Sequence, residues 1–199
     1  MRVITGKYKG RHFDVPRTFK ARPTTDFAKE NLFNVLQAYF DFASDSPSAL
    51  DLFSGTGSIT LELLSRGCSR VVAIEKEPLH CSFIRSFLNT LNDHNGVVVR
   101  ADVLRFLPRC TERFDLIFAD PPYQLPELAQ LPNFIFRNEP DVNGKSATDH
   151  TLVTGNGPSP LLKEGGLFIL EHGKDHDFSS HPHFVEHRAY GSVNFSFFQ

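Results

Sequence analysis

The four residues Asp120-Pro121-Pro122-Tyr123 follow an apolar run and combine groups that could hold a planar base. Two prolines fix the local backbone and have no amide hydrogen to donate, so a turn built on them is rigid. An exocyclic amine could donate its two hydrogens to the Asp120 carboxylate and the Pro121 carbonyl while Tyr123 stacks on the ring. The alternative is a plain strand-ending turn, because Asp-Pro and Pro-Pro are common breakers of secondary structure.

A second group of residues forms a glycine-rich turn, Asp51-Leu-Phe53-Ser-Gly55-Thr-Gly57, at the end of another apolar run. Glycines there let the backbone approach a ligand and leave helix N-terminal amides free to face it. A dinucleotide fingerprint needs a third glycine or alanine, but Thr60 stands at that position, where we expect its hydroxyl to crowd the helix against the strand. The turn alone could bind nothing. Most of the 20 phenylalanines suit core packing, with Phe53 as an exception that could face a ligand.

Two further acids follow the next apolar runs. Glu75 stands 18 residues after Gly57, where a carboxylate accepts hydrogen bonds from both hydroxyls of a ribose. Asp102 could meet an adenine amino group, or it could only cap a turn. Because parallel strands end at one edge of a sheet, these acids and the glycine turn predict a site for an adenosine cofactor.

Short, nearly continuous apolar runs alternate with helical patterns from residue 48 onward, which predicts an open, doubly wound α/β domain. The expected helices are 57–66, 78–92, with an apolar stripe from Leu79 to Leu91, and a short one at 103–109. The expected strands are residues 49–53, 70–75, 97–100, 114–120 and 166–171.

The two flanks differ from this body. Residues 1–22 predict a small basic β-hairpin arm, and residues 23–199 the main domain, which opens with a helix after Pro23 that Thr24 or Thr25 caps. Residues 139–160 predict a long flexible insertion, since 15 of those 22 positions are Pro, Gly, Ser, Thr, Asn or Asp. Residues 190–198 alternate with period two and predict a last strand.

Charge is unevenly distributed along the chain. The formal net charge is −2, but residues 1–22 hold seven Lys or Arg against one Asp, a charge of +6, so the remainder carries −8. Such a segment could bind the phosphates of a nucleic acid, or it could be only a solvated hairpin. The candidate RNA-binding residues are Arg2, Lys7, Lys9, Arg11, Arg17 and Lys20.

Composition argues against several other classes of protein. The sequence contains no run of about 18 apolar residues, so it predicts no membrane span. The first residues lack the apolar core of a secretory signal, so we expect a cytoplasmic protein. The three cysteines are widely spaced without a CxxC pair, which favours reduced, buried thiols. Five of the nine histidines lie in residues 172–187, but Gly173 and Pro182 interrupt any helix that could present them, so we expect no metal site.

The sequence resembles a known family. Asp/Asn-Pro-Pro-Tyr is the signature of S-adenosylmethionine-dependent amino methyltransferases, and residues 51–57 resemble their cofactor loop. The chain is more similar still to the bacterial small-subunit ribosomal RNA guanine-N2 methyltransferases of the RsmD type. This resemblance covers nearly the whole chain and rests on residues 2–11, Arg22-Pro-Thr-Thr-Asp26, Asn31-Leu-Phe-Asn34, Ser65-Arg-Gly67, the Asp-Pro-Pro-Tyr turn and Tyr190-Gly191.

The resemblance implies a Rossmann-like, seven-stranded sheet whose last strand is antiparallel. It implies methylation of a guanine N2 amine in 16S ribosomal RNA, within the small ribosomal subunit, by a protein that we expect to be a monomer. The insertion at 139–160 departs from the family's short link. The implied cofactor contacts are Asp51, Gly55, Gly57, Glu75 for the ribose and Asp102 for adenine, with Arg22 and Thr24 at the mouth and residues 120–123 in catalysis.

The expected mechanism is alignment rather than strong base catalysis, because hydrogen bonds to Asp120 and the Pro121 carbonyl would expose the amine lone pair. Three alternatives remain. A nicotinamide-dependent dehydrogenase would share the glycine turn and Glu75 but would not explain the Asp-Pro-Pro-Tyr turn. An adenine-N6 DNA methyltransferase usually brings a large recognition domain, for which 199 residues leave no room. A non-catalytic RNA-binding assembly factor could retain the same fold.

Overall fold

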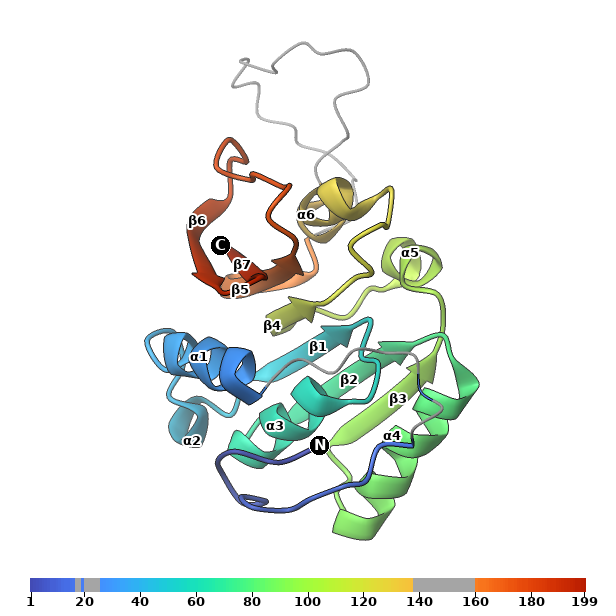
Figure 1. Cartoon of the computed structure of the whole chain (residues 1–199). Coiled ribbons are helices and arrows are strands. Elements are labelled where there is room, and N and C mark those ends of the chain that lie inside the picture. Colours follow the sequence, from blue (N-terminus) through green and yellow to red (C-terminus); the bar gives the residue numbers. More distant parts are fainter. Residues whose placement is uncertain (17–18, 20–25, 138–159) are drawn as a thin grey trace.

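A seven-stranded sheet forms the centre of the computed structural model, which describes residues 1–16, 19, 26–137 and 160–199 (Figure 1). The strand order is β3-β2-β1-β4-β5-β7-β6. The first five strands are parallel, whereas β7 runs antiparallel to β5 and β6 antiparallel to β7. The strands are β1 (Ser48–Leu52), β2 (Arg70–Glu75), β3 (Gly96–Arg100), β4 (Phe114–Ala119), β5 (Leu162–His172), β6 (Phe184–Tyr190) and β7 (Val193–Phe198).

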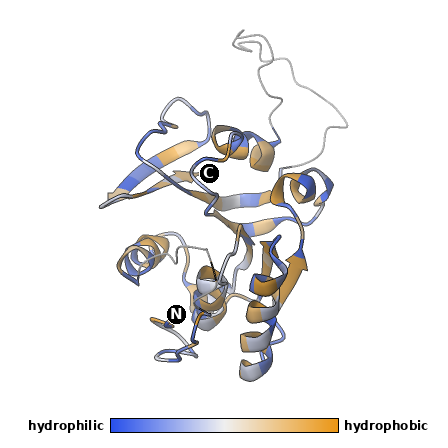
Figure 2. Ribbon diagram, turned by 45° about the vertical axis from the view of Figure 1, so that its right-hand side comes forward, coloured by the Kyte–Doolittle hydropathy of each residue, from blue (hydrophilic) through white to orange (hydrophobic). Residues whose placement is uncertain are grey.

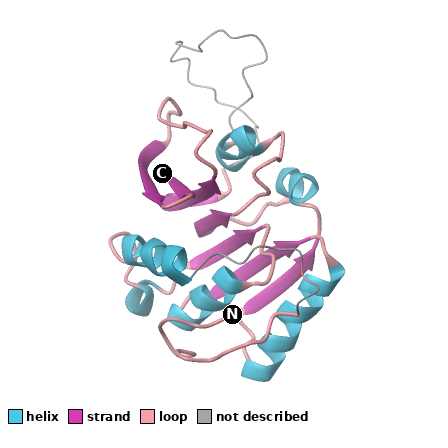
Figure 3. Cartoon of the chain, viewed as in Figure 1, coloured by secondary structure: helices cyan, strands magenta, loops and turns pink. Residues whose placement is uncertain are grey.

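Helices cover both faces of this sheet, as Figure 3 shows in cyan. One face packs against α1 (Asp26–Leu36), α3 (Ser58–Arg66) and α4 (Pro78–Leu91). The other face packs against α5 (Val103–Phe106), η1 (Leu107–Arg109), η2 (Leu128–Gln130) and α6 (Leu131–Phe136). A short helix, α2 (Phe42–Asp45), precedes β1. The doubly wound α/β fold that the alternating pattern predicted is therefore confirmed.

The central strands are buried because they carry apolar side chains toward both layers of helices (Figure 2). In β1, Ala49 packs in the core beneath α3 and α4, and Leu50 packs in the core on the opposite face. The same alternation extends to β7, where Phe195 and Phe197 join the first core and Phe198 the second. The two cores, one on each face of the sheet, fix the strands so that the carboxyl ends of the parallel strands lie side by side.

Most predicted elements begin or end within one residue of the observed ones, and the departures have physical causes. β5 starts at Leu162 rather than 166, because exposed residues at its start hide the pattern. The tail predicted from 190 is a turn at Gly191 followed by β7. The preceding β6 was not predicted, since its side chains are mostly polar at an exposed sheet edge. Leu79 is 67% exposed, so the stripe predicted on α4 is wrong at its first position.

The N-terminal residues form a short antiparallel hairpin around a bridge between Arg2 and His12, in which the amide of Phe13 donates to the Met1 carbonyl at 3.0 Å and the amide of Val3 to the Arg11 carbonyl at 3.1 Å. The segment does not extend from the body as an arm, because it packs along α3. The backbone amide of Lys7 donates to the Ser65 carbonyl at 2.7 Å. Gly6 has a φ of 88°, and a Cβ there would lie 1.9 Å from the Ser65 oxygen, so the crossing requires glycine.

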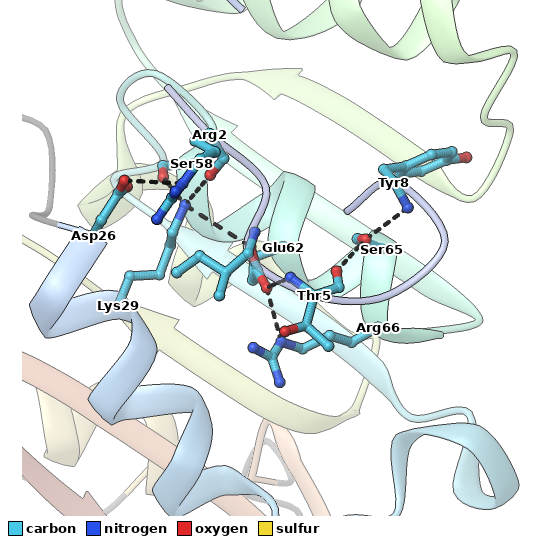
Figure 4. Close-up of polar contacts among 10 residues, drawn as sticks. Arg2, Thr5, Tyr8, Asp26, Lys29, Ser58, Glu62, Ser65 and Arg66 are labelled. Carbon is cyan, nitrogen blue, oxygen red and sulfur yellow. Dashed lines mark hydrogen bonds and ion pairs between the residues drawn. The ribbon is translucent and has the colours of Figure 1, made fainter. Parts of the chain in front are cut away.

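A buried ion network fixes this segment to the body (Figure 4). The Glu62 carboxylate, fully buried on α3, accepts hydrogen bonds from the amides of Ile4 and Thr5 at 2.8 and 3.0 Å and pairs with Arg66 at 3.0 Å. The Lys29 ammonium, only 1% exposed, lies 3.8 Å from Glu62 and donates to the carbonyl of Arg2 at 2.6 Å. Burial lowers the pKa of Lys29, against the opposing charge of Glu62.

Several expectations fall outside the described residues: the roles of Arg17, Lys20, Arg22 and Thr24, the cap at Thr24 or Thr25, and the insertion at 139–160 apart from residue 160. All three cysteine side chains are buried, as predicted. Among the helices of the described ranges, none is long and apolar enough to cross a membrane.

Candidate active site

A pocket of about 670 Å³ opens at the carboxyl ends of β1, β2 and β4, between α3 and the start of α5. It brings together most of the residues that the sequence analysis proposed. They are Asp51, Phe53, Gly55, Glu75, Asp102, Asp120, Pro121, Pro122 and Tyr123.

The turn between β1 and α3 is tight and held by its own hydrogen bonds. Phe53, Gly55 and Gly57 have φ values of 59°, 52° and 74°. The Ser54 hydroxyl donates to the carbonyl of Asp51 at 2.7 Å, and the amide of Gly57 donates to the Ser54 carbonyl at 2.7 Å. A Cβ at Gly57 would lie 2.8 Å from a side-chain carbon of Ile84, so packing against α4 already requires this glycine. Its contact with a cofactor stays a prediction.

Asp51 is buried at the base of the pocket and is held by Thr60. Both the amide, at 3.0 Å, and the hydroxyl of Thr60 donate to Oδ2 of Asp51. The expected crowding at Thr60 is therefore wrong, because its hydroxyl turns to the strand and forms a hydrogen bond there. Burial raises the pKa of Asp51 to about 7, and the charge of Glu75 adds to the shift against the hydrogen bonds from Thr60.

Glu75 is fixed by two backbone amides at the next strand end. Its Oε2 accepts a hydrogen bond from Gly55 at 2.8 Å, and its Oε1 accepts one from Glu77 at 2.8 Å. His80 also lines the pocket, and its Nδ1 lies 3.8 Å from Oε1 of Glu75, too far for a hydrogen bond. That nitrogen is buried without a hydrogen-bond partner. The sequence analysis did not select His80.

Asp102 caps a helix, which was one of its two predicted roles, and it also lines the pocket. Its Oδ1 accepts a hydrogen bond from the amide of Arg105 at 3.2 Å and so caps α5. The side chain still lines the pocket and its surface is exposed. A contact with adenine therefore stays a prediction beside an observed structural role.

The Asp-Pro-Pro-Tyr turn begins directly after β4 and forms another wall of the pocket. Asp120 keeps part of its surface open, and its amide donates to the Leu52 carbonyl at 3.3 Å. Tyr123 is 40% exposed, which leaves ring surface available for stacking, and its hydroxyl donates to Oε1 of Glu171 at 3.2 Å. Burial, followed by the charges of Glu171 and Asp51, raises the pKa of Asp120 well above its usual range.

Glu171 is a pocket residue that the sequence analysis missed. It lies near the end of β5 and is only 4% exposed. Burial raises its pKa to about 7, against the hydrogen bond from Tyr123. Its position at the end of a predicted strand was a usable signal, because the same rule selected Glu75 and Asp120.

The histidines of residues 172–187 and the described candidate RNA-binding cations do not line the pocket. His172 is buried, and its Nε2 lies 2.8 Å from the Ser196 hydroxyl. Within the described residues, no group of three or more His, Cys, Asp and Glu side chains is placed to hold a metal ion. Lys7 and Arg2 pair with Asp93 at 3.0 Å and Asp26 at 3.4 Å, whereas the side chains of Lys9 and Arg11 are exposed.

The family model described as Conserved hypothetical protein 95 matches residues 1–139 of the chain. The "Putative rRNA methyltransferase YlbH" of Bacillus subtilis is 37% identical over 88% of this chain and 84% of its own length. The chain belongs to the RsmD-type family. The ribosomal RNA small subunit methyltransferase D of Escherichia coli (strain K12) is 33% identical over 69% of this chain and 68% of its own length.

A solved structure supports the same membership. That of "Putative methyltransferase yhhF" from Escherichia coli is 26% identical, with a TM-score of 0.77 over 100% of this chain and 97% of that one. The likeness extends through β5, β6 and β7, which lie beyond the residues that the family model matches.

Proposed function

We propose that this chain transfers a methyl group from S-adenosylmethionine to the exocyclic N2 amine of a guanine in 16S ribosomal RNA, within the small ribosomal subunit. Its membership of the RsmD-type family supports methyl transfer to this RNA. The observation that carries the proposal is a single pocket lined by both halves of such a site. The glycine turn and Glu75 form one end, and the Asp-Pro-Pro-Tyr turn forms the other.

The chemistry of the pocket fits S-adenosylmethionine, which carries a positive charge and two ribose hydroxyls. The pKa of each of the acids Asp51, Asp120 and Glu171 is raised, mainly because charge there is poorly solvated, so a cationic ligand would stabilise their ionised forms. The carboxylate of Glu75 and the unpartnered Nδ1 of His80 lie together where ribose hydroxyls could bind both. The residues present therefore suit this cofactor.

The chain has to align the amine and expose its lone pair. S-adenosylmethionine supplies, when bound, a methyl group on a sulfonium that is a good leaving group. Hydrogen bonds from the amine to Asp120 and the Pro121 carbonyl would favour a pyramidal nitrogen, while the ring of Tyr123 stacks on the base. Alignment of this kind lowers a barrier by roughly 7 to 11 kcal/mol in well-oriented cases.

Binding of the RNA would use the basic N-terminal residues. Lys9 and Arg11 are exposed on the segment that packs along α3 and suit contacts with phosphates. Lys7 and Arg2 are less suited, because each already pairs with an acid. We extend the proposal to Arg17 and Lys20 for RNA, to Arg22 and Thr24 at the pocket mouth, and to a monomer acting in the cytoplasm.

The test of the proposed chemistry is methyl transfer by Asp120→Ala at saturating S-adenosylmethionine, with small ribosomal subunits lacking the modification as substrate. We expect a loss of at least a hundredfold in turnover, because the amine loses an acceptor that orients it. Asp45→Ala is the control. Asp45 is an exposed acid on α2, just before the start of β1, whereas the pocket lies at the ends of the parallel strands. Turnover of Asp120→Ala within threefold of the wild type would refute the role of Asp120.

The identity of the methylated base is tested by mass spectrometry of nucleosides from the treated RNA. We expect one N2-methylguanosine per subunit. N6-methyladenosine instead would assign the chain to adenine methylation. RNA binding without cofactor binding in calorimetry would support an assembly factor and overturn the proposed enzyme.

A further inference from the structure

Glu171 has one carboxylate oxygen that the protein leaves without a partner. Its Oε1 accepts the hydrogen bond from the Tyr123 hydroxyl at 3.2 Å, whereas Oε2 is buried and makes no hydrogen bond. An unsatisfied buried polar atom costs about 1 to 3 kcal/mol, more if it is charged. Within the described residues, only His80 Nδ1 and Arg137 Nε share this condition, and Arg137 does not line the pocket. The Glu171 oxygen therefore points to a donor that arrives with a ligand.

The pairing of β4 with β5 places Glu171 beside Asp120. These strands are parallel neighbours, with Ala119 opposite Leu170, so Asp120 and Glu171 occupy the next positions on adjacent strands. Both side chains line the pocket together with Tyr123. The amine of a base held by the Asp-Pro-Pro-Tyr turn would therefore lie near two carboxylates, those of Asp120 and Glu171.

The proposed reaction needs a destination for a proton. The nitrogen lone pair forms the bond to the methyl carbon as the carbon–sulfur bond breaks and sulfur keeps that electron pair. The methylated nitrogen then carries a positive charge and four bonds, to the base, to the methyl carbon and to two hydrogens. It must lose one of these protons to give the neutral product. Asp120 and the Pro121 carbonyl orient the amine, so a separate carboxylate is suited to remove the proton.

We propose that Glu171 is the proton acceptor of this methyl transfer, with the Tyr123 hydroxyl orienting its carboxylate so that Oε2 faces the reacting amine. This inference rests on the proposed function. As the nitrogen becomes tetrahedral, the N–H that it donated to Asp120 turns to Oε2 of the neighbouring Glu171. That N–H bond breaks with its electron pair staying on nitrogen, and the proton passes to Oε2 and leaves to water when the product departs. A pKa of about 7 suits a group that must both take up and release a proton near neutral pH.

The groups that face Glu171 set its expected pH dependence. They are the Tyr123 hydroxyl, which donates to Glu171, and Asp120 after β4, whose pKa the charge of Glu171 raises; Asp51 on β1 acts in turn on Asp120. A protonated Glu171 cannot accept the proton, so the single-turnover rate should fall toward acid pH. Bound S-adenosylmethionine favours the ionised carboxylate, so this fall should lie below pH 7. Asp51 affects mainly cofactor binding, which saturation removes, whereas Asp120 titrates in the same pocket and has to be separated by mutation.

The experiment compares Glu171→Gln, Glu171→Asp and the wild type in single-turnover methylation of small ribosomal subunits from pH 5.5 to 9, with saturating S-adenosylmethionine. We expect Glu171→Gln to be at least tenfold slower at pH 7.5 and to lose the acidic limb of the profile. Glu171→Asp should keep that limb and recover part of the rate. Glu164→Gln, at an exposed position on the same strand, is the matched control and should behave as the wild type.

The outcomes separate this inference from the proposed function. A wild-type rate in Glu171→Gln overturns the inference alone. A slower Glu171→Gln that keeps the acidic limb also overturns it, because the limb then belongs to Asp120 and Glu171 only shapes the site. If Glu171→Gln does not fold, the inference is judged by Glu171→Asp, whose profile without an acidic limb would refute it. If the wild-type protein binds S-adenosylmethionine and methylates no RNA, the proposed function itself fails.

Discussion

At the scale of single residues, the pocket concentrates acids that protein folding alone does not favour. Burial raises the pKa of Asp51, Asp120 and Glu171, and the charges of Glu171 and Asp51 add to the shift at Asp120. A folded protein that holds such groups binds protons more tightly than its unfolded chain does. The arrangement is consistent with a site organised for a cation rather than for the stability of the ligand-free protein.

We therefore expect the affinity for S-adenosylmethionine to depend on pH. Asp51 and Glu171 have pKa values of about 7, so both are mostly neutral at pH 6 and mostly ionised at pH 8. The Kd should decrease by about tenfold over this range, because ionised carboxylates attract the sulfonium. Calorimetry at both pH values provides the measurement. S-adenosylhomocysteine, whose sulfur is neutral, is the control, and an equal pH dependence for both ligands would contradict this interpretation.

His80 gives a second prediction at this scale. Its Nδ1 is buried and unpartnered beside Glu75, and its ring contacts that of Phe19 at 4.4 Å between centroids. His80→Phe keeps a ring but removes the hydrogen-bonding nitrogen, so we expect cofactor binding to weaken by roughly 3- to 10-fold, the value of one hydrogen bond. Leu79→Ala, at the exposed neighbouring position, should leave the Kd unchanged. Equal affinities in both variants would remove His80 from the ribose end of the site.

The site could be predicted only as far as strand ends reveal it. Asp51, Glu75 and Asp120 each lie at or near the end of an apolar run, and their shared place at the strand ends, with the glycine turn, selected them. Thr60 and His80 lie inside helical segments, and their roles depend on contacts that form only when α3 and α4 pack on the sheet. The unpartnered oxygen of Glu171 depends likewise on the hydrogen bond from Tyr123 across two elements.

At the scale of elements, the buried network of Lys29, Glu62 and Arg66 joins three parts of the chain (Figure 4). Lys29 also donates to the Ser58 hydroxyl at 3.1 Å, and Ser58 lines the pocket at the start of α3. The same cation thus contacts the N-terminal segment, through the Arg2 carbonyl, and the start of α3 beside the pocket. Nothing in the linear sequence distinguishes Glu62 from an ordinary exposed helix acid.

Removal of the Glu62 carboxylate should be costly. Glu62→Ala leaves a buried ammonium and a guanidinium without their anion and two amides without an acceptor, so we expect a loss of about 3 to 5 kcal/mol in the free energy of unfolding. Urea denaturation measures this difference. Glu164→Ala, which is exposed on β5, should change it by less than about 0.5 kcal/mol. Similar midpoints for the two variants would show that the network contributes little to stability.

The predicted elements are those whose own residues determine them. The strands β1, β2 and β4 are apolar throughout because both faces are covered, and α4 shows its buried stripe over four turns. β6 is the outermost strand of the sheet and its residues are mostly polar, so it carries no apolar pattern. α2 has only four residues, too few to show a helical period. Their positions follow from the tertiary contacts of β7 and of the first core.

At the scale of the whole molecule, the distribution of charge changes the meaning of the basic N-terminus. The described part of the predicted basic hairpin arm packs along α3, and the acids of the body neutralise part of its charge through Asp93 and Asp26. Despite the burial of Asp93, hydrogen bonds from Tyr8 and Lys7 lower its pKa. Within the described part of this segment, Lys9 and Arg11 are exposed cations that form no salt bridge.

Salt dependence of RNA binding should separate these cations. Replacing both Lys9 and Arg11 by glutamine should reduce the slope of log K against log salt by about 1 to 2 units, since each lost phosphate contact contributes about one. Lys7→Gln should change the slope less, because Asp93 already neutralises that charge. Arg109→Gln is the control, because Arg109 is an exposed cation at the end of η1, outside the N-terminal segment. Filter binding to small ribosomal subunits measures each slope, and identical slopes in all variants would exclude this segment from the RNA interface.

β3 forms one outer edge of the sheet and is rich in valine, a composition that favours pairing with strands of other molecules. The guanidinium of Arg85, from α4, donates to the Val98 carbonyl of this strand at 3.0 Å and so places a charge on a backbone group that a foreign strand would need. At the opposite edge, β6 carries charged side chains and an irregular register between Phe184 and Glu186. Both ends of the sheet are therefore poor templates for edge-to-edge aggregation, and the folded domain is protected against the association that its exposed strands would otherwise promote.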